Sequence, residues 1–332
     1  MKKFDRTRLE VEPLDYRTHD LDLSAVRELQ GTPERFGGAM TAAAARILNA
    51  GERGAAVILF MGAHVIRSGV QRYIINMMEN GYINSIAMNG AGVIHDYEFA
   101  LAGATTESVS RYIKDGRFGM WKETGAINDI INRAYAEDPD CGFGEAVGRA
   151  VFEGDFPHKD ISLLCAAYRL GIPATVHVGI GCDIIHQHPN CDGAATGALS
   201  YNDFLAFAAV VERLEGGVVM NFGSAVMAPE VFLKSLSMAR NVARQEGRSI
   251  ADFMTLVCDL HELPQDLGQD TGKESSKDGA AYYFRPFKTM LVRTVSDGGV
   301  GRYVKGRHGQ TVPALWSALD EARKACRAGG AS

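Results

Sequence analysis

Residues 174–193 read ATVHVGIGCDIIHQHPNCDG, a strand-like run followed by a dense cluster of ionisable side chains. The run predicts a β-strand because β-branched residues alternate with other side chains as far as Val178. Gly179 and Gly181 then end the strand, and Asp183 follows among several His and Cys residues. Ligands of open parallel α/β sheets bind at the carboxyl ends of the strands. We therefore expect the functional site of the protein at this strand end.

The same stretch contains four side chains of types that bind zinc, namely Cys182, His186, His188 and Cys191. Their spacing matches no common zinc module, and no second paired cluster accompanies them, so we predict no bound metal. A metal-dependent enzyme built on this cluster stays open as an alternative. In the simpler interpretation, Cys182 is a small core residue and one histidine caps a turn.

Apolar runs bounded by glycine recur on both sides of this stretch. They predict further strands at 55–62, 83–88, 217–224 and 253–258. Helical patterns lie between and around them, at 70–79, 126–136, 143–152, 201–214 and 231–245. Strands that alternate with helices are typical of a doubly wound sheet. We therefore predict an α/β protein with a Rossmann-like, mostly parallel sheet and helices on both faces.

The C-terminal part of the chain has weaker patterns. The polar segment 263–279 is predicted to be a surface loop, because it is rich in Gly, Asp, Gln, Lys and Ser. Strands are expected at 290–295 and 302–305, and Pro313 is expected to open the last helix, where proline is well placed.

Composition limits the class of protein. The chain has 332 residues, is 46% hydrophobic and carries a formal net charge of −5. No basic patch interleaved with aromatics is present, which argues against nucleic acid and anionic membranes as partners. No secretory signal, no bilayer-spanning apolar run and no paired cysteine spacing is apparent, so we expect a cytoplasmic protein with reduced thiols. We predict an N-terminal arm with helices over residues 1–50 and a single domain over residues 51–332.

Small residues at the predicted strand ends indicate a cofactor site. The turn at 89–92 follows a strand and precedes a helix, so its backbone N–H groups could approach a phosphate. The full Gly-x-Gly-x-x-Gly fingerprint is absent, and a plain tight turn is the alternative. Similar strand ends at Gly62, Gly179 and Gly223 favour a cofactor crevice along one edge of the sheet.

Lys288 is the candidate nucleophile. It follows a segment rich in aromatic residues, YYFRPF at 282–287, which would desolvate its ammonium and favour the neutral amine. The same aromatic rings could instead contact a cationic substrate. An exposed strand lysine beside core aromatics is the simpler alternative.

Short motifs along the chain resemble those of deoxyhypusine synthase. They are IRSGV at 66–70, NGAGV at 89–93 followed by Asp96, GCDI at 181–184, GVVMNFG at 217–223, and PALW at 313–316. The similarity covers about residues 50–320, and it rests on the order and spacing of the motifs more than on any one of them.

This resemblance implies a Rossmann-like homotetramer with NAD bound at subunit interfaces. The family oxidises the secondary amine of spermidine with NAD and passes the butylamine unit to an active-site lysine as a Schiff base. The unit then moves to an acceptor lysine of a translation initiation factor, whereas bacterial relatives use putrescine and make homospermidine.

Carried over by position, the resemblance implies a set of cofactor-contacting residues. These are His64, Ser68, Asn89, Gly90, Ala91, His95 and Gly223. Asp183 matches the family's amine-binding aspartate, and Lys288 best matches its Schiff-base lysine. His188 is the third catalytic candidate, because imidazole titrates near neutral pH and could replace a lost base.

The chain departs from the family at substrate-binding positions. The family's paired glutamates are Ile94 and His95 here, its substrate-contacting histidine is Ala228, and the tryptophan before its lysine is Pro286. We therefore predict an NAD-dependent transferase of amine or polyamine chemistry with an altered small-amine substrate. A metal-dependent enzyme and a non-catalytic binding protein on the same fold are the alternatives.

Overall fold

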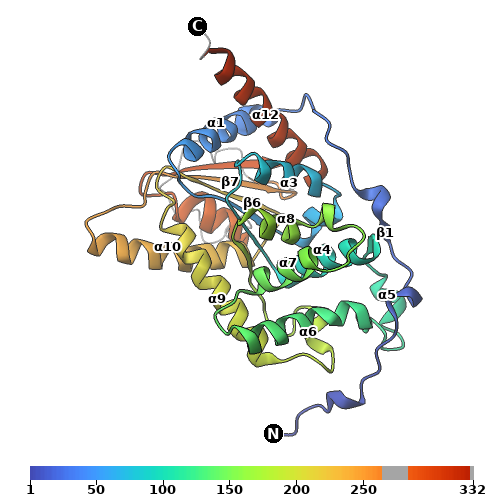
Figure 1. Ribbon diagram of the computed structural model, residues 1–332. Coiled ribbons are helices and arrows are strands. Elements are labelled where there is room, and N and C mark those ends of the chain that lie inside the picture. The colour runs from blue at the N-terminus through green and yellow to red at the C-terminus, as the bar shows by residue number, and fades with distance from the viewer. Residues whose placement is uncertain (264–282, 330–332) are drawn as a thin grey trace.

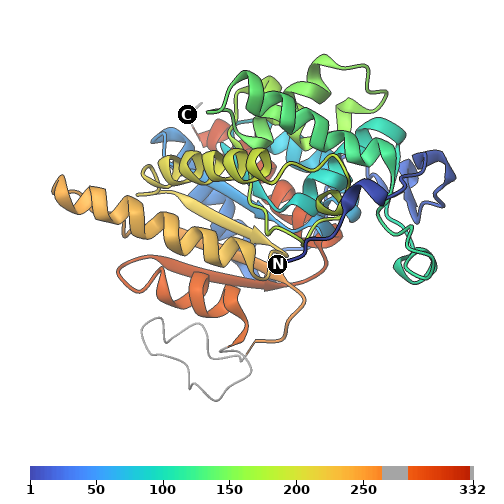
Figure 2. The same cartoon turned by 90° about the horizontal axis from the view of Figure 1, so that it is seen from below.

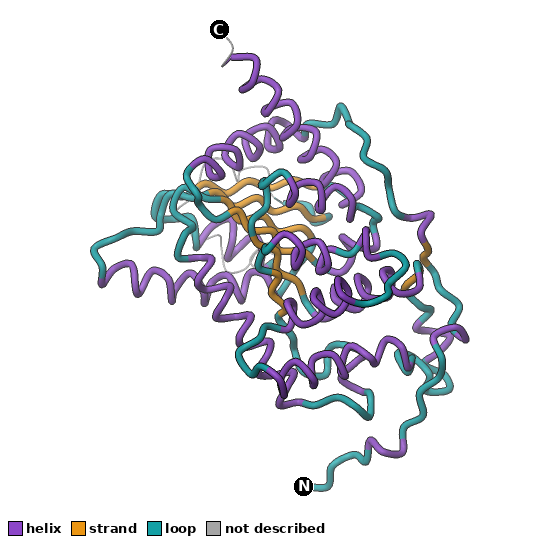
Figure 3. The backbone as a smooth tube through the Cα atoms, in the orientation of Figure 1, coloured by secondary structure: helices purple, strands orange, loops and turns teal. Residues whose placement is uncertain are grey.

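The computed structural model describes residues 1–263 and 283–329, so the loop predicted at 263–279 lies almost entirely outside the described residues. A six-stranded parallel sheet forms the centre, in the order β5-β3-β2-β6-β7-β8. Its strands are β2 (Val57–Met61), β3 (Ser85–Met88), β5 (Ala174–Val176), β6 (Val218–Phe222), β7 (Met254–Asp259) and β8 (Val300–Lys305). Figure 3 shows these strands in orange between layers of helices.

The first strand of this sheet along the chain, β2, lies in its middle. The next two strands, β3 and β5, extend the sheet on one side, and β6, β7 and β8 extend it on the other. This is the strand order of dinucleotide-binding α/β folds, in which the order reverses between the first and fourth strands. The predicted α/β, Rossmann-like, doubly wound parallel sheet is therefore confirmed.

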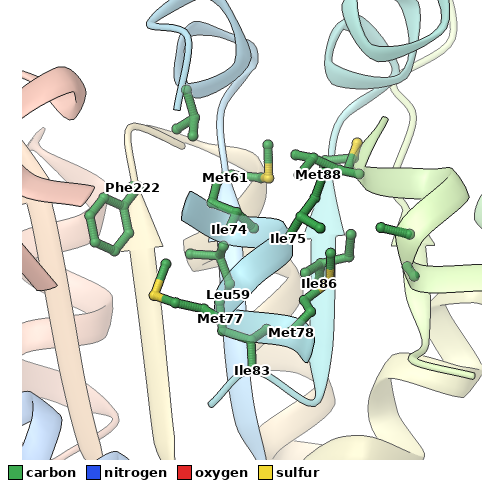
Figure 4. Packing of buried hydrophobic residues seen from close by; sticks show 14 of the residues in the cluster. Leu59, Met61, Ile74, Ile75, Met77, Met78, Ile83, Ile86, Met88 and Phe222 are labelled. Atoms are coloured by element: carbon green, nitrogen blue, oxygen red, sulfur yellow. The ribbon is translucent and has the colours of Figure 1, made fainter. Parts of the chain in front are cut away.

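The central strands are buried on both faces, as their continuous apolar runs predict. In β2, Val57, Leu59 and Met61 belong to one core cluster, whereas Ile58 and Phe60 belong to the cluster on the opposite face. Figure 4 shows the first cluster, in which side chains of α3 (Gln71–Glu79) pack on β2 and β3. This double burial holds the strand ends in a rigid row.

Helices cover both faces of the sheet (Figure 1). Their bounds are α1 (Ala39–Glu52), α2 (Ala63–Arg67), α3 (Gln71–Glu79), α4 (Gly90–Ala102), α5 (Val109–Tyr112), α6 (Lys122–Glu137), α7 (Phe143–Glu153), α8 (Leu163–Leu170), α9 (Gly193–Val211), α10 (Met227–Gln245) and α12 (His308–Gly329). Helices α1, α3, α8 and α12 pack in the first cluster, and α10 with the C-terminal half of α9 packs in the second. Figure 2 shows α9 and α10 side by side.

Helix α9 differs from its prediction in length. It was expected from Tyr201 but begins at Gly193, where the side chain of Asp192 accepts hydrogen bonds from two amides of the first turn. Among the described residues it is the one helix long and apolar enough to cross a membrane, whereas the sequence was expected to contain no such run. It packs against β5, α6, α7 and α10, as a core helix of a globular domain does.

Two C-terminal predictions were wrong. Residues 290–295 do not form a strand, because 286–293 form a π-helical turn, η8 (Pro286–Arg293). Its Phe287, Met290 and Leu291 follow helical spacing and bury one apolar face in the second cluster. Pro313 lies inside α12 and does not open it. Proline has no N–H group to donate to the carbonyl of Gly309, four residues earlier. Nη1 of Arg27, in the N-terminal arm, donates to that carbonyl instead, at 2.6 Å.

The N-terminal arm runs along one side of the helical layer, in dark blue in Figure 1. It contains short 3-10 turns and a two-residue strand, β1 (Leu21–Asp22), which pairs antiparallel with β4 (Ala104–Thr105). Helix α1 spans the predicted boundary at residue 50 and packs against α12, so it belongs to the core of the domain. The division at residue 50 stays a prediction.

Candidate active site

The small residues at the carboxyl ends of three adjacent strands lie at one edge of the sheet. Gly62 follows β2, Asn89 follows β3, and Gly223 follows β6. A Cβ atom at Gly62 would overlap with the carbonyl oxygen of Gly223, so these two strand ends approach as closely as glycine allows. They flank the point between the first and fourth strands where ligands bind in this fold class.

The N-terminus of α4, where the sequence predicts a phosphate, is already occupied by side chains. Asn89 accepts from the amide of Gly92 at 3.1 Å, and the carboxylate of Asp183 accepts from the amide of Ala91. Gly90 is required here because a Cβ atom would overlap with the Asp183 carboxylate. The structure therefore brings Asn89, Gly90, Ala91 and Asp183 together, with Asp183 in the position of an anion.

The N-terminus of α2 is arranged differently. Gly62 is its N-cap residue, and no side chain caps this turn. Among the described residues, no partner accepts from the amides of Ala63 and His64. This five-residue helix follows the central strand at the point where the strand order reverses.

A cavity of about 310 Å³ lies at the carboxyl ends of β3 and β5, beside the C-terminal end of α2. The arm, α2, α4, the segment after β4 and the segment after β5 all contribute to its wall. Its lining residues are Arg17, Asp20, Arg67, Ala91, Ile94, His95, Glu98, Thr106, Glu107, Val109, Phe118, Cys182, Asp183 and Ile184. Cavities of this size hold small molecules.

A buried ion pair forms the floor of this cavity. Arg17 donates from Nη1 and Nη2 to the two oxygens of Glu98 at 2.8 and 2.7 Å, and both side chains are 1% exposed. Thr105 and Thr124 donate their hydroxyls to the same carboxylate at 2.6 and 2.5 Å. These contacts and Arg17 lower the pKa of Glu98 against its burial, so this carboxylate is ionised at neutral pH.

This network fixes the tautomer of His95. Because the hydroxyl of Thr105 donates to Glu98, it can only accept from the His95 Nδ1, which lies 2.8 Å away. Burial lowers the pKa of His95 to about 4, so the ring is neutral at pH 7. Its Nε2 atom is therefore an acceptor on a residue that lines the cavity.

Asp183 is a buried carboxylate in the wall of the same cavity. Burial raises its pKa to about 6, and the amide of Ala91 opposes this shift. Nδ1 of His186 is 3.9 Å from an Asp183 oxygen, but it accepts from the amides of Gly181 and Asp183 at 3.2 Å. This Nδ1 atom therefore carries no hydrogen, and His186 does not neutralise Asp183.

Other predicted residues lie outside the cavity wall. His64 is exposed on α2 with its Nε2 atom 3.1 Å from Nη1 of Arg67, and Ser68 donates its hydroxyl to the His64 carbonyl at 2.7 Å. His188 is buried and donates from Nε2 to the Gly119 carbonyl at 2.6 Å. That bond gives His188 a role in holding the loop before α6, and its catalytic role stays a prediction.

Lys288 lies on the far side of the sheet from Asp183. It is part of η8, which packs against β7, β8 and α10, whereas Asp183 follows β5 and contacts α4. β5 and β7 are separated by four strand spacings of about 4.8 Å each. Within one chain the structure therefore does not bring Lys288 and Asp183 together, and the nucleophile role stays a prediction.

The His and Cys side chains after β5 do not converge. Cys182 is exposed at the cavity, whereas His188 and Cys191 are buried elsewhere. Within residues 1–263 and 283–329, no group of three or more His, Cys, Asp or Glu side chains is arranged to hold a metal ion.

Three residues of this region were not predicted from the sequence. Arg17 and Glu98 are 81 residues apart and carry no local motif, so only their contact in the fold reveals them. His308 begins α12 beside Gly223, where a Cβ atom would overlap with its Nε2 atom. Nδ1 of His308 is buried and has no partner among the described residues.

Comparison with known proteins identifies the fold. No protein-family model and no curated protein matches the chain. A conserved LOR/SDH protein from Methanococcus maripaludis S2 is similar, with 16% identity and a TM-score of 0.52 over 90% of this chain and 74% of that one. Unliganded AgrE has 15% identity and a TM-score of 0.51 over 88% of this chain and 34% of its own. A point mutant of AgrE in a binary complex with L-arginine has 15% identity and a TM-score of 0.51 over 90% and 35%.

At these identities the likeness shows the fold and nothing finer. The chain spans about a third of the length of AgrE. The resemblance to deoxyhypusine synthase is thus supported only at the level of a related Rossmann-like fold.

Proposed function

We propose that this protein is an NAD-dependent enzyme that acts on a small amine. The observation that carries the proposal is the cavity with Asp183 and His95, which lies after β3 and β5 and borders α2, the helix that follows the central strand. AgrE, which shares the fold, has been solved with ornithine and NAD+. The proposal takes from that protein only the class of cofactor and substrate.

The residues present fit a dinucleotide. The uncapped amides of Ala63 and His64 would bind a phosphate, and the glycine pair Gly62 and Gly223 lets the backbone of both strand ends approach the cofactor. His308 would contact the cofactor from the start of α12. Bound NAD+ would accept a hydride from the carbon next to the substrate nitrogen.

The side chains of the cavity would bind the amine, take up its proton and orient it. A substrate amine enters as an ammonium ion and pairs with the Asp183 carboxylate. Because burial raises the pKa of Asp183 to about 6, this carboxylate can take one proton from the ammonium and leave a neutral amine. Nε2 of His95 accepts an N–H bond from that amine and orients it. Loss of the hydride from carbon then leaves an iminium ion, which is the reaction class of amine oxidation.

A transfer step through Lys288, as in deoxyhypusine synthase, is a further part of the proposal. It requires a neighbouring subunit to bring Lys288 to the cavity, because the two lie apart within one chain. Borohydride treatment with an amine and NAD+ should trap an adduct on Lys288, located by peptide mass spectrometry. An adduct that forms equally in Lys288→Arg would remove this step from the mechanism.

Helix α9 supports assembly into a homo-oligomer, which we propose to be a tetramer. Its exposed side contains Gly197, Tyr201 and Leu205 and no charged residue, whereas its one charged side chain, Asp203, is buried. A helix that is apolar on its outer face needs a cover. Gly197 and Leu205 lie equally far from Tyr201 on this side, so an antiparallel copy of α9 can seat Leu205 against Gly197. A cytoplasmic location remains our expectation.

Calorimetry with NAD+ tests the cofactor site. Ala63→Pro removes one uncapped amide while keeping the first helical position, where proline is tolerated. We expect binding of NAD+ to the wild-type protein and about tenfold weaker binding to the variant, since a hydrogen bond to a charged group contributes roughly 1.5–3 kcal/mol. Gly193→Pro, at the same position of the distant α9, is the matched control. Equal affinities of Ala63→Pro and wild type would place the cofactor elsewhere.

A further inference from the structure

Two charged side chains in the cavity wall, one of each sign, form no ion pair among the described residues. One is Asp183, whose carboxylate accepts from the Ala91 amide and contacts no cation among the described residues. The other is Arg67 at the end of α2, which forms no ion pair with any described carboxylate. Its Nε atom is buried and has no hydrogen-bond partner there. Arg67 is thus the one arginine of the wall that pairs with no described carboxylate.

The other charged residues of the wall are already satisfied or exposed. Arg17 and Glu98 neutralise each other. Glu107 accepts from the amide of Gly119 at 3.0 Å and from the indole nitrogen of Trp121 at 2.9 Å. Asp20 is exposed to solvent. Glu107 and Asp20 form no ion pair either, but Glu107 has a donor on each carboxylate oxygen and Asp20 faces solvent, so Arg67 and Asp183 are the two charges best placed to bind a ligand.

These two groups are separate, and His95 is close to one of them. The positive charge of Arg67 helps to lower the pKa of His95, whereas no cation lowers the pKa of Asp183. Arg67 and Asp183 line the same cavity but form no ion pair with each other. Leaving both charges unpaired in a partly buried cavity is unfavourable, and a ligand with one group of each sign would relieve both.

We propose that the substrate is an amino acid whose ammonium group pairs with Asp183 and whose carboxylate pairs with Arg67. This inference rests on the proposed function and names its substrate class. The planar guanidinium binds a carboxylate through two parallel N–H bonds. With both ends held, the amine carbon lies between Arg67 and Asp183, next to His95.

Amines that differ only in a carboxylate test this assignment. L-Ornithine and L-lysine are matched by putrescine and cadaverine, which lack the carboxylate. Calorimetry of the full chain, with and without NAD+, should show at least tenfold tighter binding of one of the amino acids than of its matched diamine. Oxidation followed at the absorbance of NADH should show the same preference in kcat/KM.

Arg67→Met keeps the apolar stem of the side chain and removes its charge. We expect it to weaken amino-acid binding at least tenfold, to leave diamine binding within a factor of about two and to leave NAD+ binding unchanged. Arg67→Lys should restore part of the preference, because it restores the charge without the planar fork. Arg53→Met, at an exposed arginine, is the matched control.

The outcomes separate this inference from the proposed function. Equal binding of amino acids and diamines would overturn the amino-acid assignment. An Arg67→Met variant that loses only NAD+ affinity would overturn it as well, because Arg67 would then contact the cofactor phosphates. A wild-type protein that prefers amino acids without binding NAD+ would support the assignment and overturn the proposed function.

Discussion

Replacing Asp183 with asparagine should stabilise the protein and weaken its substrate binding. Asparagine has nearly the same shape, and its carbonyl oxygen can still accept from the Ala91 amide. The variant therefore removes the charge and keeps the packing against Gly90. Opposite effects on stability and binding are expected where a buried charge is retained for function.

The stability effect follows from the pKa of Asp183. Burial raises it from 3.8 to about 6, so the ionised carboxylate is less favourable in the folded protein than in the unfolded chain. The stability that the neutral carboxyl group of Asp183 contributes is fully present below about pH 4 and is lost as the pH rises through about 6. A difference of about two pH units corresponds to about 3 kcal/mol, which is the upper limit for the gain in the free energy of unfolding at pH 7.5.

The binding effect has the opposite sign. Loss of a charged hydrogen-bond partner costs about 1.5–3 kcal/mol, so Asp183→Asn should bind the substrate amine roughly 10- to 150-fold more weakly. In the wild-type protein, the affinity should fall about tenfold for each pH unit below 6, as the carboxylate takes up its proton.

Urea denaturation at pH 7.5 and pH 4 measures the first effect, and calorimetry with L-ornithine measures the second. Asp155→Asn is the control, because Asp155 is exposed and makes no side-chain hydrogen bond among the described residues. At pH 7.5 the variant should unfold at a higher urea concentration than wild type, and at pH 4 the difference should shrink. A variant that is less stable at pH 7.5 would show that the fold needs the Asp183 carboxylate, and it would refute this reasoning.

Three other substitutions test the rest of the structure. Arg17→Met leaves the buried Glu98 unpaired, and urea denaturation should show a loss of roughly 3–5 kcal/mol in the free energy of unfolding; a loss below about 1 kcal/mol would mean that the arm does not hold the cavity floor. Leu205→Asp places a charge on the exposed side of α9, where Leu205 is 42% exposed, and light scattering should show smaller particles than for wild type; an unchanged mass would remove α9 from the interface. Lys288→Arg should abolish aminobutyl transfer and spare NAD+ affinity, and full turnover would exclude a lysine imine.

The sequence alone was sufficient to predict the central strands of the sheet and the positions at which they end. Continuous apolar runs bounded by glycine identify β2, β3 and β6, because a strand buried on both faces admits few polar residues. The same glycines mark the turns at which backbones approach closely, and Asp183 directly follows such a turn. Residues 286–293 misled the prediction, because one apolar face at helical spacing also contains β-branched residues.

Only the tertiary structure decided which side chains share a cavity. Arg17 reaches Glu98 from a separate part of the chain, and Arg67 and Asp183 face one cavity although 116 positions separate their numbers. Sequence patterns report local periodicity, whereas the partner of a charge depends on how distant segments pack. For this reason the sequence alone suggested that Lys288 and Asp183 belong to one site. The sheet order places them apart within the chain, because β3, β2 and β6 lie between β5, which precedes Asp183, and β7, which precedes Lys288.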